Sequence, residues 1–403
     1  MQARFGDGGH GFHLLAQNNP SYRHKGVKVT YAGEWQRCYV INKCKKDRRY
    51  GLGGLTVWSS GGGETRFRFG REDDEGHEGR TDRMEVWYAT QPRGGDLTVK
   101  VDGEVRAVIE TRAEEPGEGR AVVQVPAGTH EYRVRATGGG SARAFGVVLE
   151  HEGPGLVWDG VALIGAFTSR FSPRYLDEAH FGRQLRMRGT ELAVLMFGGN
   201  DLLGFRPARY RETFRATLTM LREASPATPC LVMSVIDHAE RKGSRIVSKP
   251  DVAPMVQLQR EEALAAGCAF FDAHAAMGGE GSMARWNRAK PRLASGDLAH
   301  LTHRGHQVMG ELFTTSLLAA YVDFRQAVAG TPLPATAQTP TPAPGPVDSG
   351  PVVPAPVDSG PVEGGADTPA ADPSLPSSPP HREGEATQDQ VAPTVEDATP
   401  AAG

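Results

Sequence analysis

The stretch "GDLAHLTHRG", Gly296 to Gly305, places an aspartate three residues before a histidine, just ahead of a segment with helical periodicity. A carboxylate at this spacing can orient an imidazole, and an oriented imidazole can take a proton from a hydroxyl group. Asp297 and His300 are therefore candidates for the orienting carboxylate and the base of a hydrolytic reaction. The sequence must then supply the hydroxyl that His300 would activate.

Two other segments supply hydrogen-bond donors. Gly165 stands in "LIGAFTSRF" and Asn200 in "GGNDLLG", and each follows an apolar run. A glycine offers an approachable backbone N–H and an asparagine offers a side-chain N–H, so the two aimed at one point would form an oxyanion hole. Each residue alone is also typical of an ordinary loop. Their order along the chain, each after an apolar run, makes the combination specific.

From Leu156 onward, apolar runs alternate with amphipathic segments. We predict strands in "VALIGA", "LAVLMFGGND", "CLVMSVID" and "CAFFDAHAAM". We predict helices in "YLDEAHFGRQLRMRG", "RYRETFRATLTMLREA", "APMVQLQREEALAAG" and the long segment that begins at Thr302. This alternation predicts an α/β fold with a doubly wound parallel sheet, in which ligands bind beyond the carboxyl ends of the strands. The candidate site residues all fall at such ends.

The segment from Glu64 to His151 has a different pattern, in which apolar and polar residues alternate between turns. Several such strands at short intervals predict an all-β sandwich or jelly roll. The pair Asp102-Gly103 predicts a tight hairpin, because such a turn needs positive φ. Trp87 and Tyr88 lie on one strand, and ordinary packing in the core or on the surface is favoured for both over stacking on a sugar.

The composition excludes some classes of function. Positive and negative residues are interspersed with a formal net charge of −3, and "KCKKDRR" at 43–49 is more typical of a solvated loop than of a phosphate site, so we expect no nucleic-acid partner. No apolar run approaches the roughly 20 residues that span a bilayer. From Thr331 the chain is rich in Pro, Ala, Ser and Glu, which predicts a disordered tail.

The cysteines leave the redox compartment open. Cys38 and Cys44 are close in sequence, and Cys230 and Cys268 would lie side by side if the apolar runs after them form neighbouring parallel strands. Disulfides would suit an oxidising compartment and free thiols a reducing one.

Four histidines lack the spacing with Cys, Asp or Glu that a zinc site needs. They are His10, His13, His303 and His306. We expect them to occupy loops and the surface, and we expect no metal and no cofactor.

The ordered residues resemble the SGNH, or GDSL-type, esterase family, whose four blocks supply Ser, Gly, Asn and Asp-x-x-His. Gly165 matches the second block, Asn200 the third, and Asp297 and His300 the last. The segments "RFGDGGHGF" and "MGGEGSMARW" and the inserted sandwich resemble the peptidoglycan O-acetylesterase branch.

This resemblance implies a flavodoxin-like parallel sheet and a triad in which Asp297 orients His300, with Gly165 and Asn200 as the oxyanion hole. It also implies an acetylated polysaccharide or peptidoglycan as substrate, and a periplasmic, secreted or cell-envelope location.

The nucleophile of that family is a serine in a "GDS" turn after the first strand, and "QARFGDGG" here follows Met1 directly. Either the serine lies upstream of this chain, along with any signal peptide, or the protein is a catalytically inactive carbohydrate-binding or cell-envelope scaffold with the same fold. We favour the first, because a parallel sheet without its first strand leaves a hydrophobic slot. Ser169 is a weak substitute, as is Ser282, because neither falls on a strand-to-helix turn.

The expected organisation has four parts. Residues 1–60 would form a truncated N-terminal part of the hydrolase domain, 61–155 the inserted sandwich, 156–328 the rest of the hydrolase domain and 329–403 the disordered tail. We expect these 403 residues alone to have little esterase activity.

Overall fold

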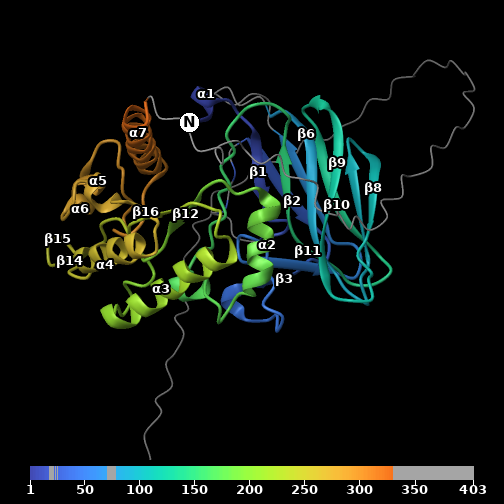
Figure 1. The fold of residues 1–403 in the computed structure, drawn as a ribbon, viewed down its shortest axis with the longest axis horizontal. Helices are drawn as coiled ribbons and strands as arrows, with labels where there is room; N and C mark the ends of the chain where they lie inside the picture. Colours follow the sequence, from blue (N-terminus) through green and yellow to red (C-terminus); the bar gives the residue numbers. More distant parts are fainter. Residues whose placement is uncertain (18–21, 23, 25, 70–78, 330–403) are drawn as a thin grey trace, which may run out of the picture. The chain divides into compact units, whose positions relative to one another are not determined.

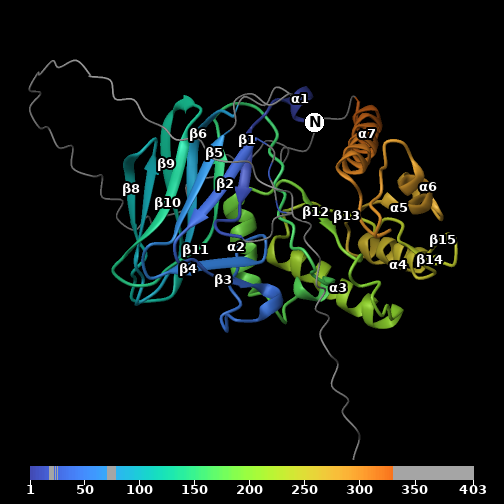
Figure 2. The same ribbon diagram turned by 180° about the vertical axis from the view of Figure 1, so that it is seen from behind.

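The computed structural model describes residues 1–17, 22, 24, 26–69 and 79–329 (Figures 1 and 2). The predicted tail lies outside these residues from position 330 onward. A short helix, α1 Gln2–Phe5, opens the chain. No helix of the described part is both long and apolar enough to cross a membrane.

Antiparallel strands of the first 150 residues form two sheets. In chain order they are β1 Gly9–His13, β2 Val27–Ala32, β3 Gln36–Tyr39, β4 Leu55–Ser59, β5 Glu64–Phe69, β6 Thr81–Thr90, β7 Asp96–Val101, β8 Glu104–Glu110, β9 Gly117–Gly128, β10 Glu131–Gly138 and β11 Ala142–Glu150. One sheet has the order β3-β4-β11-β6-β9, with β1 also paired to β11, and the other has the order β2-β5-β10-β7-β8. Figures 1 and 2 show the two sheets stacked face to face, as the sequence predicted.

Two local predictions within the sandwich are confirmed. Asp102 and Gly103 join β7 to β8 with φ values of 52° and 91°, the positive values that a tight hairpin turn needs. Trp87 and Tyr88 of β6 are 0% and 2% exposed. Both rings therefore pack in the core and do not face a ligand.

Strand β11 connects the sandwich to the rest of the molecule, and each of its residues is buried. One face packs into the sandwich core, and helix α2 Glu178–Arg188 covers the other. The ring centroids of Phe145 and His180 lie 4.7 Å apart, and Arg188 forms an ion pair with Glu150 at 2.6 Å. A single hydrophobic cluster takes in residues of both halves of the chain.

The division between the sandwich and the hydrolase part does not fall at residue 60. Strands β1 to β4 come from residues 1–60, which we expected to belong to the hydrolase domain, yet β1 and β4 pair with β11 and β2 pairs with β5. The inward residues of these strands, such as Phe12 and Val57, are buried in the shared cluster. They join the sandwich because its core is where their apolar side chains leave water.

The second half of the chain forms a parallel sheet with the order β12-β13-β16. Its elements are β12 Ala193–Met196, β13 Cys230–Met233, β16 Ala269–Phe271 and the helices α3 Pro207–Ala224, α4 Val252–Ala265 and α7 His303–Ala327. Between them lie the hairpin β14 Ala239–Lys242 and β15 Arg245–Ser248 and the short helices α5 Ala273–Met277 and α6 Ser282–Arg288. The second half of "CAFFDAHAAM" is thus helical, because the Asp272 side chain accepts from the N–H of Ala275 and starts α5.

The predicted strand in "VALIGA", residues 161–166, is wrong. These residues form no strand, and Ile164 is 49% exposed. Among the described residues, β12 pairs with β13 alone, and no strand pairs with the backbone of 161–166. A short apolar run becomes a strand only when a second strand accepts its backbone hydrogen bonds.

Both cysteine pairs are disulfides, Cys38–Cys44 and Cys230–Cys268. The sequence left the disulfide state open. The second bridge joins the starts of two neighbouring parallel strands, the arrangement in which these cysteines were expected to lie side by side, because Leu231 of β13 is paired with Ala269 of β16.

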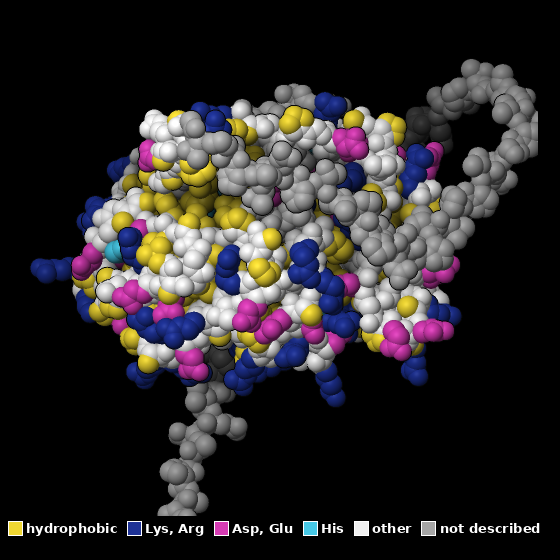
Figure 3. Space-filling model, viewed as in Figure 1, with side chains coloured by type: hydrophobic (Ala, Val, Ile, Leu, Met, Phe, Trp, Pro, Cys, Tyr) yellow, Lys and Arg dark blue, Asp and Glu magenta, His cyan; other side chains and the backbone are white. Residues whose placement is uncertain are grey.

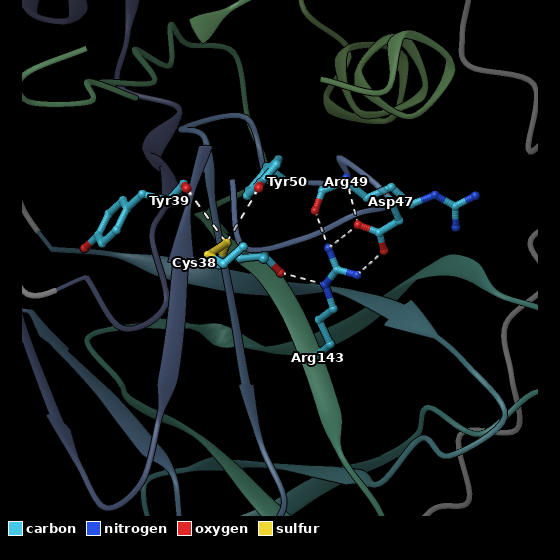
Figure 4. Close-up of a disulfide and its surroundings, with 8 residues drawn as sticks. Cys38, Tyr39, Asp47, Arg49, Tyr50 and Arg143 are labelled. Atoms are coloured by element: carbon cyan, nitrogen blue, oxygen red, sulfur yellow. Dashed lines mark hydrogen bonds and ion pairs between the residues drawn. A yellow bond between two sulfur atoms is a disulfide. The ribbon is translucent and has the colours of Figure 1, made fainter. Parts of the chain in front are cut away.

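Figure 4 shows the surroundings of Cys38. There Arg143 of β11 donates to Thr56 at 2.9 Å and contacts the Asp47 carboxylate and the Arg49 carbonyl. These contacts hold the basic loop at 43–49 against the sandwich.

The surface position expected for His13 is also wrong. Its side chain is 0% exposed, and its ring lies 4.0 Å from that of His24 and 5.9 Å from that of Phe67. Burial, together with the neighbouring histidines His24 and His10, lowers the pKa of His13 well below its usual value. His13 and its neighbour Phe12 are both fully buried, so an alternating pattern does not describe β1, whereas His303 and His306 are exposed at the start of α7.

The two disulfides should differ in their contribution to stability. Removing the Cys230–Cys268 bridge by Cys→Ala substitution at both positions should lower the free energy of unfolding by about 4 kcal/mol, because it closes a loop of 38 residues. The same change at Cys38–Cys44, with a separation of 6, should cost about 2 kcal/mol. Urea denaturation of the two double variants measures both values, and an equal or larger loss for the shorter loop would contradict the prediction.

Candidate functional site

The aspartate and the histidine that the sequence singled out are in direct contact. Nδ1 of His300 lies 2.7 Å from Oδ2 of Asp297, and the His300 side chain is 79% exposed. An imidazole that donates from Nδ1 to a carboxylate keeps a lone pair on Nε2. His300 therefore has the tautomer of a general base, with its free nitrogen open to solvent.

Hydrogen bonds keep Asp297 ionised. Its Oδ1 accepts from the Ser295 hydroxyl at 2.5 Å and from the N–H groups of Ala299 and His300 at 3.0 Å each. Partial burial acts in the opposite direction, but these donors hold the pKa of Asp297 well below its usual value. The carboxylate therefore stays charged and orients His300 across the whole neutral range.

The loop that carries the pair is anchored at Leu298. This residue has the left-handed φ of 61°, which is uncommon outside glycine, and its side chain is only 4% exposed. Its carbonyl accepts from the N–H of Ala239 at 2.9 Å, and the side chain of Asn287 donates to the carbonyl of Ser295 at 2.8 Å. The β14–β15 hairpin and α6 thus fix the loop, and Asp297 and His300 project from either side of a buried leucine.

The two predicted oxyanion donors are also brought together. The Asn200 side chain donates to the carbonyl of Ala166 at 2.9 Å, next to Gly165. The carboxylate of Asp201 accepts from the N–H and the hydroxyl of Thr168 at 3.0 and 2.8 Å. The loop after β12 is therefore tied to the loop that contains Gly165. An asparagine amide has two N–H groups, so the bond to Ala166 leaves one for a ligand.

His238 is a site residue that the sequence reading missed. It follows β13 and is 7% exposed. Its ring lies close to Gly199, since a side chain added there would place its Cβ 3.4 Å from Nε2 of His238. Its Nδ1 lies 3.0 Å from the carbonyl of Ile236. Burial lowers the pKa of His238, and the nearby charges of Lys249 and His300 lower it further. The sequence feature that could have pointed to His238 is the polar pair "DH" directly after the apolar run "CLVMSVI".

Hydrogen bonds join the segment after β13 to the Asp297–His300 loop, through Ala239 and Leu298, and the loop after β12 to the loop that contains Gly165. The arrangement offers an oriented base and amide donors at the carboxyl edge of a parallel sheet, where ligands bind in this architecture. In the described part of the chain, no group of three or more His, Cys, Asp or Glu is arranged to hold a metal ion.

Neither weak candidate for the nucleophile is suitably placed. Ser169 lies in the single turn η2 Thr168–Arg170, and its carbonyl accepts from the Ser172 hydroxyl at 2.6 Å. Ser282 begins α6, is 0% exposed and points its hydroxyl at Asp237, 3.4 Å away. Among the described residues, the ring of His300 hydrogen-bonds to Asp297 alone.

Comparison with known proteins gave one family and several structures. Residues 127–308 match the GDSL-like Lipase/Acylhydrolase family. A solved structure described as "Peptidoglycan O-acetylesterase in action" is similar with a TM-score of 0.63 and 18% identity, over 79% of this chain and 84% of that one. A family two carbohydrate esterase from Cellvibrio japonicus matches with a TM-score of 0.26 and 10% identity, over 72% and 97% of the two chains. No curated protein matches the chain.

Replacing Ser295 by alanine should raise the pKa of Asp297, because it removes one of the donors to Oδ1. A carboxyl with a lowered pKa stabilises the fold above its unfolded pKa and loses that contribution as the pH falls through its folded pKa. The wild type should therefore keep the contribution to lower pH than Ser295→Ala.

Titration of the aspartate carboxyl carbons by NMR, with Asp297→Asn to assign the signal, measures this shift. Ser172→Ala is the matched control, since its hydroxyl bonds to a backbone carbonyl away from Asp297. An unchanged pKa of Asp297 in Ser295→Ala would show that Ser295 has no such role.

Proposed function

We propose that the protein is a serine esterase of the SGNH/GDSL type that removes O-acetyl groups from a carbohydrate, with peptidoglycan as the favoured substrate. The match of residues 127–308 to the GDSL-like Lipase/Acylhydrolase family and the fold shared with the O-acetylesterase structure support this proposal. One observation carries the proposal: Asp297 holds His300 at 2.7 Å with Nε2 free, in a loop whose Leu298 carbonyl accepts from the N–H of Ala239, the residue after His238.

In the proposed reaction, Nε2 of His300 takes the proton of a serine hydroxyl as its oxygen attacks the acetyl carbonyl carbon. The resulting oxyanion accepts hydrogen bonds from the N–H of Gly165 and the side-chain amide of Asn200. The imidazolium, stabilised by ionised Asp297, returns the proton to the sugar oxygen as the C–O bond breaks. Water then attacks the acetyl-serine with His300 again as base, and acetate leaves.

We propose that the serine is carried by a further parallel strand, from a segment upstream of these 403 residues, which pairs with the free edge of β12. Flavodoxin-like sheets have the strand order 2-1-3-4-5, and β12-β13-β16 matches its last three members. Residues 161–166 then correspond to strand 2, at the edge of the sheet. The upstream strand that ends in the nucleophile would be strand 1, between residues 161–166 and β12.

The exposed apolar side chains around β12 support this place for a strand. Met196 of β12 is 52% exposed, and Trp158, 61% exposed, lies 6.2 Å from the ring of Phe313 in α7. Figure 3 shows hydrophobic side chains gathered in a hollow between α7 and the region of β12. The last turns of α7 are likewise half exposed at Tyr321 and Phe324. A strand followed by a helix would cover these surfaces.

The proposed substrate is a polysaccharide ester, and the proposed location is the periplasm or the cell exterior. The fold shared with the O-acetylesterase structure extends over the sandwich as well as the parallel sheet, which supports a polysaccharide ester. Two disulfides support an oxidising compartment such as the periplasm or the cell exterior. A catalytically inactive scaffold with the same fold is the second candidate, favoured because among the described residues the ring of His300 hydrogen-bonds to Asp297 and to no hydroxyl.

A version of the protein extended upstream by the preceding in-frame codons should release acetate from p-nitrophenyl acetate and from O-acetylated peptidoglycan. His300→Ala should lower kcat by a factor of about 10³ or more, since a lost base is not replaced by solvent. Asn200→Ala should lower kcat by about 10²–10³, because one donor to the oxyanion is lost.

His303→Ala is the matched control, because His303 is an exposed histidine only three residues from His300. This variant should be as active as the wild type. A stop codon directly upstream, or an extended protein without activity that His300→Ala leaves unchanged, would favour the scaffold.

A further inference from the structure

The solvent-facing side of the β2-β5-β10-β7-β8 sheet carries cations in one row across three adjacent strands. Arg66 of β5 lies directly opposite Arg133 of β10, and Arg133 lies directly opposite Lys100 of β7. Arg135 stands two residues further along β10. The residues between them, such as Val134, are fully buried, so all four cations are on the outer face. We call these four residues the cation row.

The acidic neighbours neutralise only part of the cation row. Arg66 lies 3.6 Å from Glu131 and 3.7 Å from Glu64, and Glu131 also contacts Arg133. In the described part of the chain, neither Lys100 nor Arg135 takes part in an ion pair. Like charges directly opposite each other on neighbouring strands destabilise a sheet, so this face keeps an arrangement that costs stability.

A groove of about 280 Å³ lies among these side chains. It is lined by Lys100, Arg133 and Arg135, with the hydroxyls of Thr98 and Thr137, 3.2 Å apart, beside them. Glu64 is the one acidic residue of the lining, so the groove has an excess of two positive charges. This combination of cations and hydroxyls is suited to an anion.

The lining also restricts the kind of anion. It contains no aromatic ring. Neutral sugars and nucleic-acid bases are held largely by stacking on such rings, so neither fits this groove. A planar arginine fork matches a carboxylate with two parallel hydrogen bonds. A polymer with regularly spaced carboxylates could engage both unpaired cations at once.

We propose that the cation row binds the carboxylate groups of an acidic polysaccharide. The site is on the outer face of the sandwich sheet that does not pack on α2, so it is separate from the Asp297–His300 loop. It goes beyond the proposed esterase function, because it would hold a glycan chain whether or not its esters are cleaved.

Binding of the 403-residue protein to polygalacturonate tests the proposal, measured by affinity electrophoresis and calorimetry at low salt. Lys100→Gln with Arg135→Gln should weaken binding by about tenfold or more, as expected for losing charge-assisted hydrogen bonds. Arg93→Gln is the matched control, since it removes an exposed sandwich cation that lies outside the groove. Fully methyl-esterified pectin, with the same backbone but no charge, should not bind.

Three results would overturn the proposal: no binding of polygalacturonate, equal binding of the methyl-esterified polymer, or a double variant that binds as tightly as the wild type. Polyphosphate separates carboxylate recognition from simple ion exchange, and binding as tight as that of polygalacturonate would also overturn it. Thermal melting should show both variants folded, because within residues 26–69 and 79–329 neither Lys100 nor Arg135 has an ion-pair partner to lose. The assay measures no ester hydrolysis, so its result is independent of the proposed esterase function.

Discussion

A parallel strand without a neighbour on one edge leaves backbone N–H and C=O groups unpaired there, and among the described residues β12 is paired on one edge only. Much of the structure around the site follows from this constraint. Residues 161–166 lack a strand to pair with and remain irregular, and the apolar side chain of Met196 stays half exposed. The site is built around the same place, since the loops that contain Gly165 and Asn200 flank it and are tied together by hydrogen bonds.

The residues that surround this place are already held in position. Asp297 receives four hydrogen bonds, the left-handed turn at Leu298 is anchored by a buried side chain, and the loop carbonyl is fixed by β14. Such preorganisation matters because donors and bases accelerate a reaction only when they need no rearrangement in the transition state. What the described residues lack is an attacking group next to His300, and the supporting structure is present without it.

Features set by local spacing could be predicted from the sequence. The Asp297–His300 contact depends on three residues of separation, and the end of α2 depends on Gly189, which adopts the left-handed conformation expected of it. Several features that depend on the exact pairing of distant segments could not. Residues 161–166 have the composition of a strand but no partner, and His238 becomes a site residue only through the pairing of β13 with β12. The burial of His13 likewise depends on β11.

The burial of β11 on both faces bears on how this protein can be divided. The sandwich supplies the surface on which α2 packs, and the ion pair between Glu150 and Arg188 crosses the same boundary. Trimming the chain to residues 156–329 would remove the surface that supports α2 and expose one side of a continuous core. For protein engineering the sandwich is thus an integral part of the fold, and a smaller unit would need a redesigned surface on α2.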